Sequence, residues 1–270
     1  MTDRYGVIGH PIAHSKSPVI HRQFADQTRQ ELTYEAFDIA PDALTGELNT
    51  LIDAGVKGLN VTVPHKNAIA GLVDELSERA RLAGAVNTIS IDRDGGMKGD
   101  NTDGTGLIRD LTENLRIGLA GQRLLILGAG GATRGIVPPL LEAGPARLQI
   151  ANRTAAKADA LAEQFADLGD VAACRFDALG GLHFDLVINA TSAGLSGDVP
   201  PFPASIIDAD VVCYDLSYSM GDTPFCAWAR AHGAVAVHQG WGMLVEQAAE
   251  SFLIWRGVRP DTAPVRALLP

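Results

Sequence analysis

The sequence predicts an α/β fold that contains a doubly wound parallel sheet. Short apolar runs bounded by Gly, Pro or Asn alternate with longer stretches of helical periodicity, which is the pattern of successive βαβ units. The chain has 270 residues, of which 46% are hydrophobic and 20% are charged. It can therefore bury enough apolar surface for one large domain or two domains of moderate size.

The first hundred residues predict one series of alternating strands and helices. Strands are expected at residues 4–9, 32–38, 57–61 and 86–92. Helices are expected near residues 17–29, 42–54 and 74–83. This alternation makes the first part of the chain an α/β structure in its own right.

A second series begins after Gly121 and predicts the doubly wound sheet. Buried strands are expected at residues 123–127, 147–151, 186–189, 211–215 and 234–237, and helices at residues 132–143, 155–166 and 224–231. The last periodic segment, residues 242–255, has apolar residues at helical spacing, namely Leu244, Ala248, Phe252 and Trp255. It should form an amphipathic helix that another element must cover.

The charge and the cysteines argue against several classes of partner. A net charge of −10 and a pI near 5.1 predict no general affinity for nucleic acid or anionic membranes. Cys174, Cys213 and Cys226 have neither CxxC nor CxxH spacing, so neither a disulfide framework nor a metal site is expected. No basic and apolar leader precedes the first strand, and no apolar run approaches the ~20 residues of a membrane span. We therefore expect a cytoplasmic protein.

A glycine-rich turn between an expected strand and helix predicts a dinucleotide site. The segment RLLILGAGGATRG, residues 123–135, places free backbone N–H groups at a helix N-terminus, where they can bind a pyrophosphate. The candidate residues are Gly128, Ala129, Gly130, Gly131 and Ala132. A strict GxGxxG would need glycine in place of Thr133, and such turns also occur for purely steric reasons.

The end of the next expected strand predicts a preference for NADP. A site for NAD usually has Asp or Glu there to accept a hydrogen bond from the ribose 2′-hydroxyl, but here Asn152, Arg153 and Thr154 follow the strand. Arg153 can pair with a 2′-phosphate, and Lys157 adds charge one helical turn later. The alternative is an exposed Arg and Lys at a solvated helix start.

Polar residues also gather in two segments of the first series. Ser15 and Ser17 lie just after a strand, at the start of a helix that Pro18 can begin, and their hydroxyls could bind a carboxylate. The alternative for Ser17 is simple N-capping of that helix. In GLNVTVPHKNA, residues 58–68, an apolar strand ends in three polar residues, Asn60, Thr62 and Lys66. A lone Lys66 would more often be a solvated surface charge.

Two further segments complete a polar set. GAVNTI, residues 84–89, contains Asn87, and GDNTDGTG, residues 99–106, contains Asn101, Thr102 and Asp103. Asp103 could also serve only as the cap of the helix that follows it.

Together these segments resemble the shikimate dehydrogenase family in order, spacing and residue identity. The resemblance rests on the SxS pair, NVTxPxK, NTDxxG, GAGGATR, NRT, NATSAG at residues 189–194 and GWGMLVEQA at residues 240–248. It covers essentially the whole chain. It implies two domains: an α/β substrate-binding domain at residues 1–103 and 238–270, and an NADP-binding Rossmann domain at residues 104–237.

The resemblance also implies the reaction and the residue roles. The reaction is the reversible NADPH-dependent reduction of 3-dehydroshikimate to shikimate in chorismate and aromatic amino-acid biosynthesis, with Lys66 and Asp103 as the catalytic pair. The implied substrate-binding residues are Ser15, Ser17, Asn60, Thr62, Asn87, Thr102, Tyr218 and Gln247. Beyond the glycine turn and residues 152–157, the implied cofactor-binding residues are Thr191, Ser192, Gly240 and Met243.

Two rival functions remain open at this point. A quinate or quinate/shikimate dehydrogenase would have a similar site but would often favour NAD. A non-catalytic NADP-binding regulatory protein would keep the glycine turn and Arg153 without needing Lys66 and Asp103 together. The protein is expected to be a monomer or a homodimer.

Overall fold

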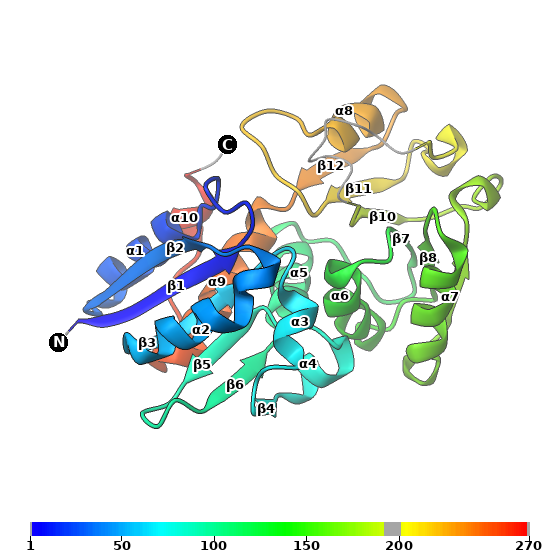
Figure 1. Ribbon diagram of the computed structural model, residues 1–270. Helices are drawn as coiled ribbons and strands as arrows, with labels where there is room; N and C mark the ends of the chain where they lie inside the picture. The colour runs from blue at the N-terminus through cyan, green and yellow to red at the C-terminus, as the bar shows by residue number, and fades with distance from the viewer. Residues whose placement is uncertain (1, 192–200, 269–270) are drawn as a thin grey trace. The chain divides into compact units, whose positions relative to one another are not determined.

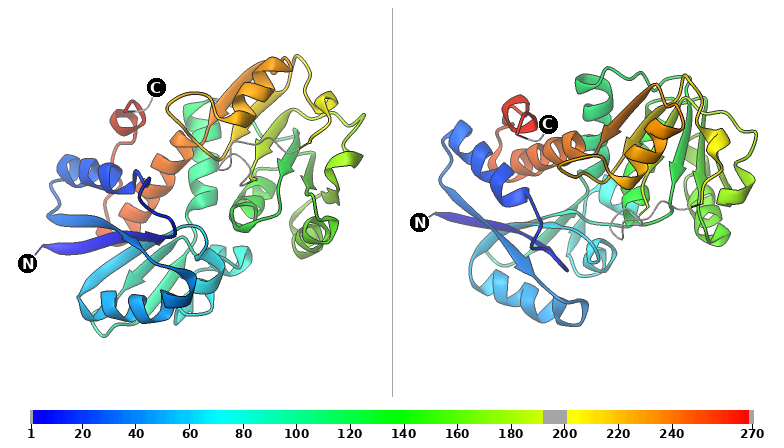
Figure 2. Two further views of the ribbon diagram at one scale, coloured as in Figure 1. Left: turned by 45° about the horizontal axis from the view of Figure 1, so that its top comes forward. Right: turned by 90° about the horizontal axis from the view of Figure 1, so that it is seen from above.

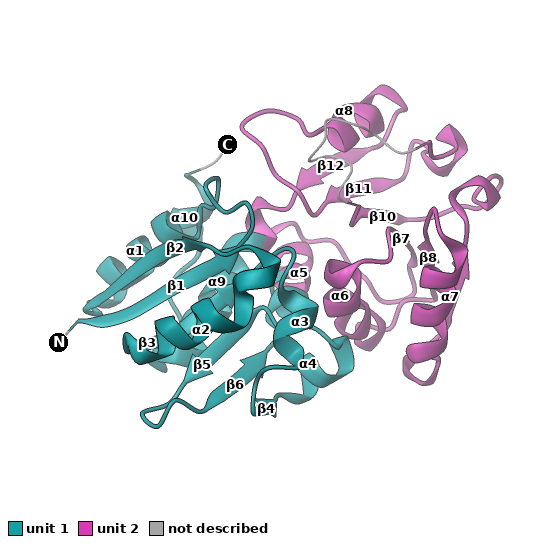
Figure 3. Cartoon of the chain, in the orientation of Figure 1, with its two compact units in different colours: residues 1–106, 244–268 teal, residues 107–243, 269–270 magenta. Residues whose placement is uncertain are grey.

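The computed structural model describes residues 2–191 and 201–268 (Figure 1). The chain forms two compact units, one from residues up to 106 together with 244–268 and the other from residues 107–243 (Figure 3). It passes into the second unit within helix α5 (Asp103–Arg109) and returns within helix α9 (Trp241–Arg256). Ser192, an expected cofactor-binding residue, lies outside the described residues.

The first unit is built on a mixed sheet with the strand order β2-β1-β3-β5-β6-β4. Its strands are β1 (Asp3–Gly9), β2 (Leu32–Asp38), β3 (Val56–Val61), β4 (Glu75–Leu76), β5 (Thr88–Ile91) and β6 (Met97–Asp100). Its other helices are α1 (Ser17–Thr28), α2 (Leu44–Asp53), α3 (Lys66–Ala70), α4 (Glu78–Ala83) and α10 (Ala263–Arg266). Strands β1, β2 and β3 are parallel, whereas β5 runs antiparallel to both β3 and β6.

Three details of this unit differ from the sequence-based expectation. The helix expected at residues 74–83 is wrong in its first part, because β4 occupies Glu75–Leu76 and α4 begins only at Glu78. Ser77, which follows β4 directly, is the N-cap of α4. Its Oγ accepts a hydrogen bond from Ala80 N at 3.2 Å. Strand β6 and the short helix α3 were not expected.

Helices cover both faces of the first sheet, as Figure 2 shows from two directions. Helices α1 and α9 lie on one face, where Phe24 contacts Phe252, and α2 packs its buried leucines on the other. The predicted amphipathic helix is confirmed as α9, and Trp255 Nε1 donates a hydrogen bond to Ile89 O at 3.0 Å. Gly58 lies directly beneath this ring, since a Cβ there would be 2.7 Å from Trp255 Cε2.

The second unit confirms the predicted doubly wound parallel sheet. Its strands are β7 (Arg123–Leu127), β8 (Arg147–Ala151), β9 (Val171–Cys174), β10 (Leu186–Asn189), β11 (Val212–Asp215) and β12 (Ala236–Gln239). All neighbouring pairs are parallel, in the order β12-β11-β10-β7-β8-β9. The chain winds outward from β7 in one direction and from β10 in the other, so the switch point lies between these two strands.

The helices of the second unit are α6 (Gly131–Glu142), α7 (Ala155–Gln164) and α8 (Pro224–Ala231). They begin close to the residues expected from the sequence. Strand β9 was not expected, because its half-buried sequence VAAC lies at the edge of the sheet and lacks a strong apolar run. Strand β12 was expected at residues 234–237 and occupies Ala236–Gln239 instead.

A buried histidine lies among aromatic side chains where α1 meets the first sheet. His21 is 1% exposed, and its ring stacks on Tyr34 with the centroids 4.1 Å apart. Its Nε2 has no hydrogen-bond partner among the described residues. Burial lowers the pKa of His21 to about 3. His21 is therefore neutral in the folded protein near pH 7.

This burial predicts a pH-dependent stability that the variant His21→Phe should lose. Between the unfolded pKa near 6.5 and the folded pKa near 3, the unfolded state binds the extra proton, so stability falls as the pH falls through this window. From pH 7 to pH 5, the wild type should lose about 2 kcal/mol more free energy of unfolding than His21→Phe. Urea denaturation at both pH values measures this difference. His14→Phe, at an exposed position, is the control and should behave as the wild type; equal losses in all three proteins would contradict the prediction.

Candidate active site

Lys66 and Asp103 form a largely buried ion pair in the first unit. Lys66 begins α3, just after the turn that follows β3, and Asp103 begins α5. The distance between Lys66 Nζ and Asp103 Oδ2 is 2.5 Å, and the side chains are 17% and 7% exposed. Lys66 is therefore not a solvated surface charge. The Asp103 carboxylate is directed to this lysine, and it does more than cap a helix.

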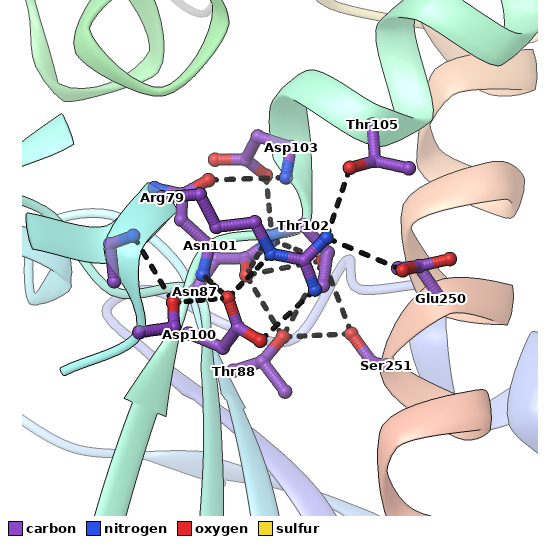
Figure 4. Close-up of polar contacts among 12 residues, drawn as sticks. Arg79, Asn87, Thr88, Asp100, Asn101, Thr102, Asp103, Thr105, Glu250 and Ser251 are labelled. Atoms are coloured by element: carbon purple, nitrogen blue, oxygen red, sulfur yellow. Dashed lines mark hydrogen bonds and ion pairs between the residues drawn. The ribbon is translucent and has the colours of Figure 1, made fainter. Parts of the chain in front are cut away.

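Asn87 fixes the other oxygen of this carboxylate (Figure 4). Its Nδ2 donates a hydrogen bond to Asp103 Oδ1 at 2.8 Å, and its Oδ1 accepts one from Thr102 N at 2.8 Å. Gln247 Oε1 lies 3.1 Å from Asn87 Nδ2 and 3.3 Å from Thr102 Oγ1. The structure thus brings five sequence-predicted residues together in one polar cluster.

A second layer of polar residues supports this cluster from the interior. Tyr34 OH donates to Asn60 Oδ1 at 2.7 Å, and Asn60 Nδ2 donates to Ser251 Oγ at 2.9 Å. Ser251 Oγ also lies 2.8 Å from Thr88 Oγ1. Burial raises the pKa of Tyr34 well above its ordinary value, so its phenol remains a neutral donor. The side chain of Asn60, expected at the substrate, is thus already bonded within the unit.

Sequence reasoning missed Thr88 and Ser251. Each had a weak signal, because Thr88 follows Asn87 directly and Ser251 lies one helical turn after Gln247 on α9. The hydroxyl of Ser251 also donates to Gln247 O at 3.1 Å, which a polar residue on a buried helix face often does.

Neither Ser15 nor Ser17 is the N-cap residue of α1. Lys16 is the N-cap of α1 and makes no side-chain capping bond, so the alternative of N-capping by Ser17 is wrong. Ser15 Oγ instead accepts a hydrogen bond from Ser17 N at 3.3 Å. Ser15 is half-buried and Ser17 is buried. Thr62 lies half-buried just after β3, with its backbone N bonded to Ile8 O at 2.9 Å.

In the second unit, the glycine turn lies at the switch point of the sheet. Gly128 follows β7 with φ of +109°, and a Cβ there would be 2.9 Å from Ala190 O, just after β10. Only glycine meets both conditions without strain. Ala129 and Gly130 complete the turn, and α6 begins at Gly131 with Gly130 as its N-cap, which offers no side chain to its first N–H groups. These groups fit a pyrophosphate.

The departure from GxGxxG at Thr133 has a structural reason. Thr133 is fully buried on α6, and its Oγ1 donates a hydrogen bond to Gly128 O at 2.9 Å. The hydroxyl closes the turn on its own helix, so a third glycine is not required there. Ala132, the residue before it, is half-buried on the first turn of α6.

The segment after β8 exposes its cations. Arg153 and Lys157 are exposed, and no hydrogen bond or ion pair of the Arg153 side chain occurs within residues 2–191 and 201–268. Asn152 Nδ2 donates to Thr154 O at 2.9 Å, which holds the chain at the start of α7. Thr154 is the N-cap residue of α7 but makes no side-chain capping bond. This segment can therefore accept an additional anionic group.

The remaining cofactor candidates follow β10 and β12. Thr191 donates from both N and Oγ1 to Asn189 Oδ1, at 3.2 and 2.8 Å. Gly240 N donates to Ser217 O at 2.9 Å, and Gly240 packs so closely on Leu216 O that a side chain would not fit. Met243 is buried in the core of this unit.

A buried carboxylate that the sequence did not reveal organises these loops. Asp215 is fully buried at the end of β11 and accepts hydrogen bonds from Asn189 Nδ2 at 3.1 Å, Thr223 Oγ1 at 2.6 Å and Ser217 N at 3.0 Å. Burial raises the pKa of Asp215, while these donors lower it. Tyr218, a predicted substrate-binding residue, lies in the same unit with its ring 5.6 Å from that of Trp241.

The described residues offer neither a metal site nor a membrane-spanning helix. Within residues 2–191 and 201–268, no group of three His, Cys, Asp or Glu side chains is placed to hold a metal ion. Among the helices of that same part of the chain, none is long and apolar enough to cross a membrane.

Comparison with known proteins identifies the family. The model of the shikimate dehydrogenase substrate binding domain matches residues 7–89, that of shikimate / quinate 5-dehydrogenase matches residues 110–196, and that of the shikimate 5′-dehydrogenase C-terminal domain matches residues 240–269. The chain belongs to the shikimate dehydrogenase family. The family predicted from the sequence motifs is therefore confirmed.

Individual known proteins resemble the chain over nearly its whole length. The NADP-dependent shikimate dehydrogenase of Methylococcus capsulatus is 55% identical over 97% of this chain and 94% of its own. An Ael1 enzyme from Pseudomonas putida, known from a crystal structure, is 47% identical in sequence. Its structure matches with a TM-score of 0.92 over 99% of this chain and 98% of its own. The shikimate 5-dehydrogenase of Thermus thermophilus, in complex with NADP(H) and shikimate, is 36% identical with a TM-score of 0.88, covering 98% of each.

The crowding at Gly128 predicts a loss of stability in Gly128→Ala. The added Cβ would meet Ala190 O and the residue would keep a positive φ, so the unfolding free energy should fall by about 1–3 kcal/mol. Gly130→Ala is the matched control, because nothing in the part of the chain that the structure describes lies within 4 Å of its added Cβ and its φ is −97°. Chemical denaturation without cofactor compares the two. Equal stability of both variants would mean that the turn relaxes around the methyl group.

Proposed function

We propose that this chain catalyses the reversible reduction of 3-dehydroshikimate to shikimate with NADPH, using Lys66 and Asp103 as the catalytic pair. The observation that carries the proposal is their buried ion pair, with Nζ and Oδ2 2.5 Å apart. The predicted reaction, enzyme class and cofactor are confirmed by full-length relatives named NADP-dependent shikimate dehydrogenase. The residue roles, which the family resemblance implies, are proposed here.

Lys66 supplies the proton in the reducing direction. NADPH, when bound, supplies the hydride to the carbonyl carbon. The Lys66 ammonium donates a hydrogen bond and then a proton to the carbonyl oxygen, and it stabilises the negative charge that develops there. In the oxidising direction, neutral Lys66 takes the hydroxyl proton.

Asp103 orients this lysine and the reacting hydroxyl. One carboxylate oxygen accepts from Lys66 Nζ, and the other accepts from Asn87 Nδ2 at 2.8 Å. Because both oxygens of the Asp103 carboxylate are hydrogen-bonded, the group has a fixed orientation. A substrate hydroxyl can then donate a hydrogen bond to it in a defined direction. Asn87 is therefore proposed to act both on the substrate and on Asp103.

The other predicted residues would hold the rest of the substrate. Ser15 and Ser17 are proposed to bind the carboxylate, which two hydroxyls near the start of α1 suit. The proposed contacts to the hydroxyls come from Asn60, Thr62, Thr102, Tyr218 and Gln247.

NADP would be held by the second unit. The glycine turn at residues 128–132 fits the pyrophosphate, and Asn152, Arg153, Thr154 and Lys157 fit the ribose with its 2′-phosphate. Thr191, Gly240 and Met243 are proposed to line the rest of the site. Residues 1–103 and 238–270 are proposed to form the substrate-binding domain, from which Gly240 and Met243 contribute to the NADP site, and residues 104–237 the NADP-binding domain.

The proposed setting is the cytoplasm, where shikimate feeds chorismate and aromatic amino-acid biosynthesis. Cys174, Cys213 and Cys226 are all free thiols, which suits a reducing compartment. A monomer or a homodimer remains the expected state.

The catalytic pair predicts a kinetic signature for Lys66→Ala and Asp103→Asn. Lys66→Ala should lower kcat by about 10²–10⁴-fold with little change in NADPH affinity, because a positioned acid acts only on the reacting oxygen. Asp103→Asn should also lose activity, and the double variant should lose less than the product of the two. NADP reduction with shikimate, followed by absorbance, measures each rate.

Lys98→Ala provides the matched control for this pair. Lys98 forms an ion pair with Glu75 at 2.7 Å in the same unit, but both side chains are exposed. Its kcat should equal that of the wild type. Near-normal turnover in Lys66→Ala would remove Lys66 from the chemistry, and independent losses in the double variant would contradict the two residues acting as a pair.

Quinate is the second substrate to assay, because one matching family model is described as shikimate / quinate 5-dehydrogenase. A higher kcat/KM with quinate and NAD than with shikimate and NADP would replace the proposed substrate. Cofactor binding without turnover of either compound would favour the regulatory alternative.

Cofactor choice should depend on Arg153. A charge-assisted hydrogen bond contributes roughly 1.5–3 kcal/mol, so Arg153→Ala should weaken NADP binding by about one to two orders of magnitude. NAD lacks the 2′-phosphate, so its kcat/KM should change little. Arg147→Ala is the control, since Arg147 is an exposed arginine at the opposite end of the same strand, β8. Measurements at fixed, moderate ionic strength avoid screening effects. Equal declines with NADP and NAD would contradict phosphate recognition by Arg153.

A further inference from the structure

Arg79 on α4 contacts both sides of the turn that carries Asp103. Its Nε and Nη2 donate to the two carboxylate oxygens of Asp100, at 2.6 and 3.0 Å. Its Nη1 donates to Thr105 Oγ1 at 3.1 Å (Figure 4). Asp100 precedes Asp103 and Thr105 follows it, so one guanidinium group spans the turn. A planar group with five donors is suited to such bridging.

The same guanidinium reaches the helix that carries Gln247. Arg79 Nη1 lies 3.3 Å from Glu250 Oε1, one helical turn after Gln247 on α9. Glu250 is held in turn by Arg259, whose Nη1 donates to Glu250 Oε2 at 2.8 Å. Arg79 thus joins the Asp103 turn and the Gln247 helix within the first unit.

Further hydrogen bonds hold Asp100 in place for its ion pair with Arg79. Besides Arg79, its Oδ1 accepts from Ser77 Oγ at 2.6 Å and from Asn101 N at 2.7 Å. Burial raises the pKa of Asp100, but the hydrogen bonds from Arg79 and Ser77 outweigh it and hold the pKa below its ordinary value. The carboxylate therefore remains ionised and bonded to the guanidinium.

Asn101 connects the ion pair between Arg79 and Asp100 to Asp103. Asn101 Nδ2 donates to Ala85 O at 2.9 Å, and its Oδ1 accepts from Asp103 N at 3.1 Å. We infer that Arg79 is a positioning residue that fixes the direction of the Asp103 carboxylate toward Lys66. This inference rests on the proposed function, because it assigns Arg79 to the same reaction without any contact to substrate or cofactor.

The test compares Arg79→Met, Arg79→Lys and a control, Arg256→Met. Methionine keeps much of the apolar stem of Arg79 and removes all the donors. A misplacement of about 1 Å costs on the order of 10²-fold in rate, so Arg79→Met should lower kcat by about 10–100-fold with an unchanged Kd for NADPH. Arg79→Lys keeps the positive charge but cannot bond to Asp100, Thr105 and Glu250 at once. Its kcat should therefore lie between those of Arg79→Met and the wild type. Arg256 is bonded to Asp3 and Gln30 in the same unit, so Arg256→Met should keep the wild-type kcat.

A double-variant cycle separates positioning from a merely structural role. If Arg79 acts through Asp103, adding Arg79→Met to Asp103→Asn should lower kcat by no more than about twofold further. An independent loss in the double variant, or a kcat of Arg79→Met equal to that of the wild type, overturns the inference. If Arg79→Met does not fold, Thr105→Val removes one end of the bridge and should lower kcat by about 3–10-fold; an unchanged kcat there overturns the inference too. Absence of wild-type activity with shikimate and NADP would instead overturn the proposed function.

Discussion

The buried negative charge of Asp103 constrains the whole first unit. A carboxylate that is 7% exposed is costly unless it is paired and hydrogen-bonded, and here Lys66 and Asn87 meet both requirements. Lys66 lies after the turn that follows β3, Asn87 directly precedes β5, and Asp103 begins the helix that follows β6, so the sheet must hold these three strand ends in register. The structural requirement for charge compensation and the proposed chemistry thus use the same three side chains.

Much of this arrangement could be predicted from the sequence because local patterns and family motifs agree. The strand, glycine turn and helix at residues 123–142 follow from apolar periodicity and from the need for glycine at a positive φ. Lys66 and Asp103 lie far apart along the chain, and no local rule joins them. The resemblance to a known family predicted that pair, and the structure brings the two side chains together.

The rest depends on contacts that leave little local signal. The tight connection between β5 and β6 makes these two strands antiparallel, but the alternation of apolar residues does not reveal that β5 also runs opposite to β3. The segment at residues 74–83 consists mostly of helix-forming residues, but pairing of Glu75 and Leu76 with β6 overrides their propensity, and Ser77 starts the helix only after them. Thr88, Ser251 and Arg79 are polar residues whose partners come from other elements, so their roles appear only in three dimensions.

The close approach of Gly128 to Ala190 joins two loops that the sequence separates widely. One loop follows β7 and the other follows β10, on either side of the switch point, and no side chain separates their backbones. Neither loop can shift toward the other without a steric clash. A displacement of Gly128 toward Ala190, or of Ala190 toward Gly128, is therefore passed on by direct backbone contact.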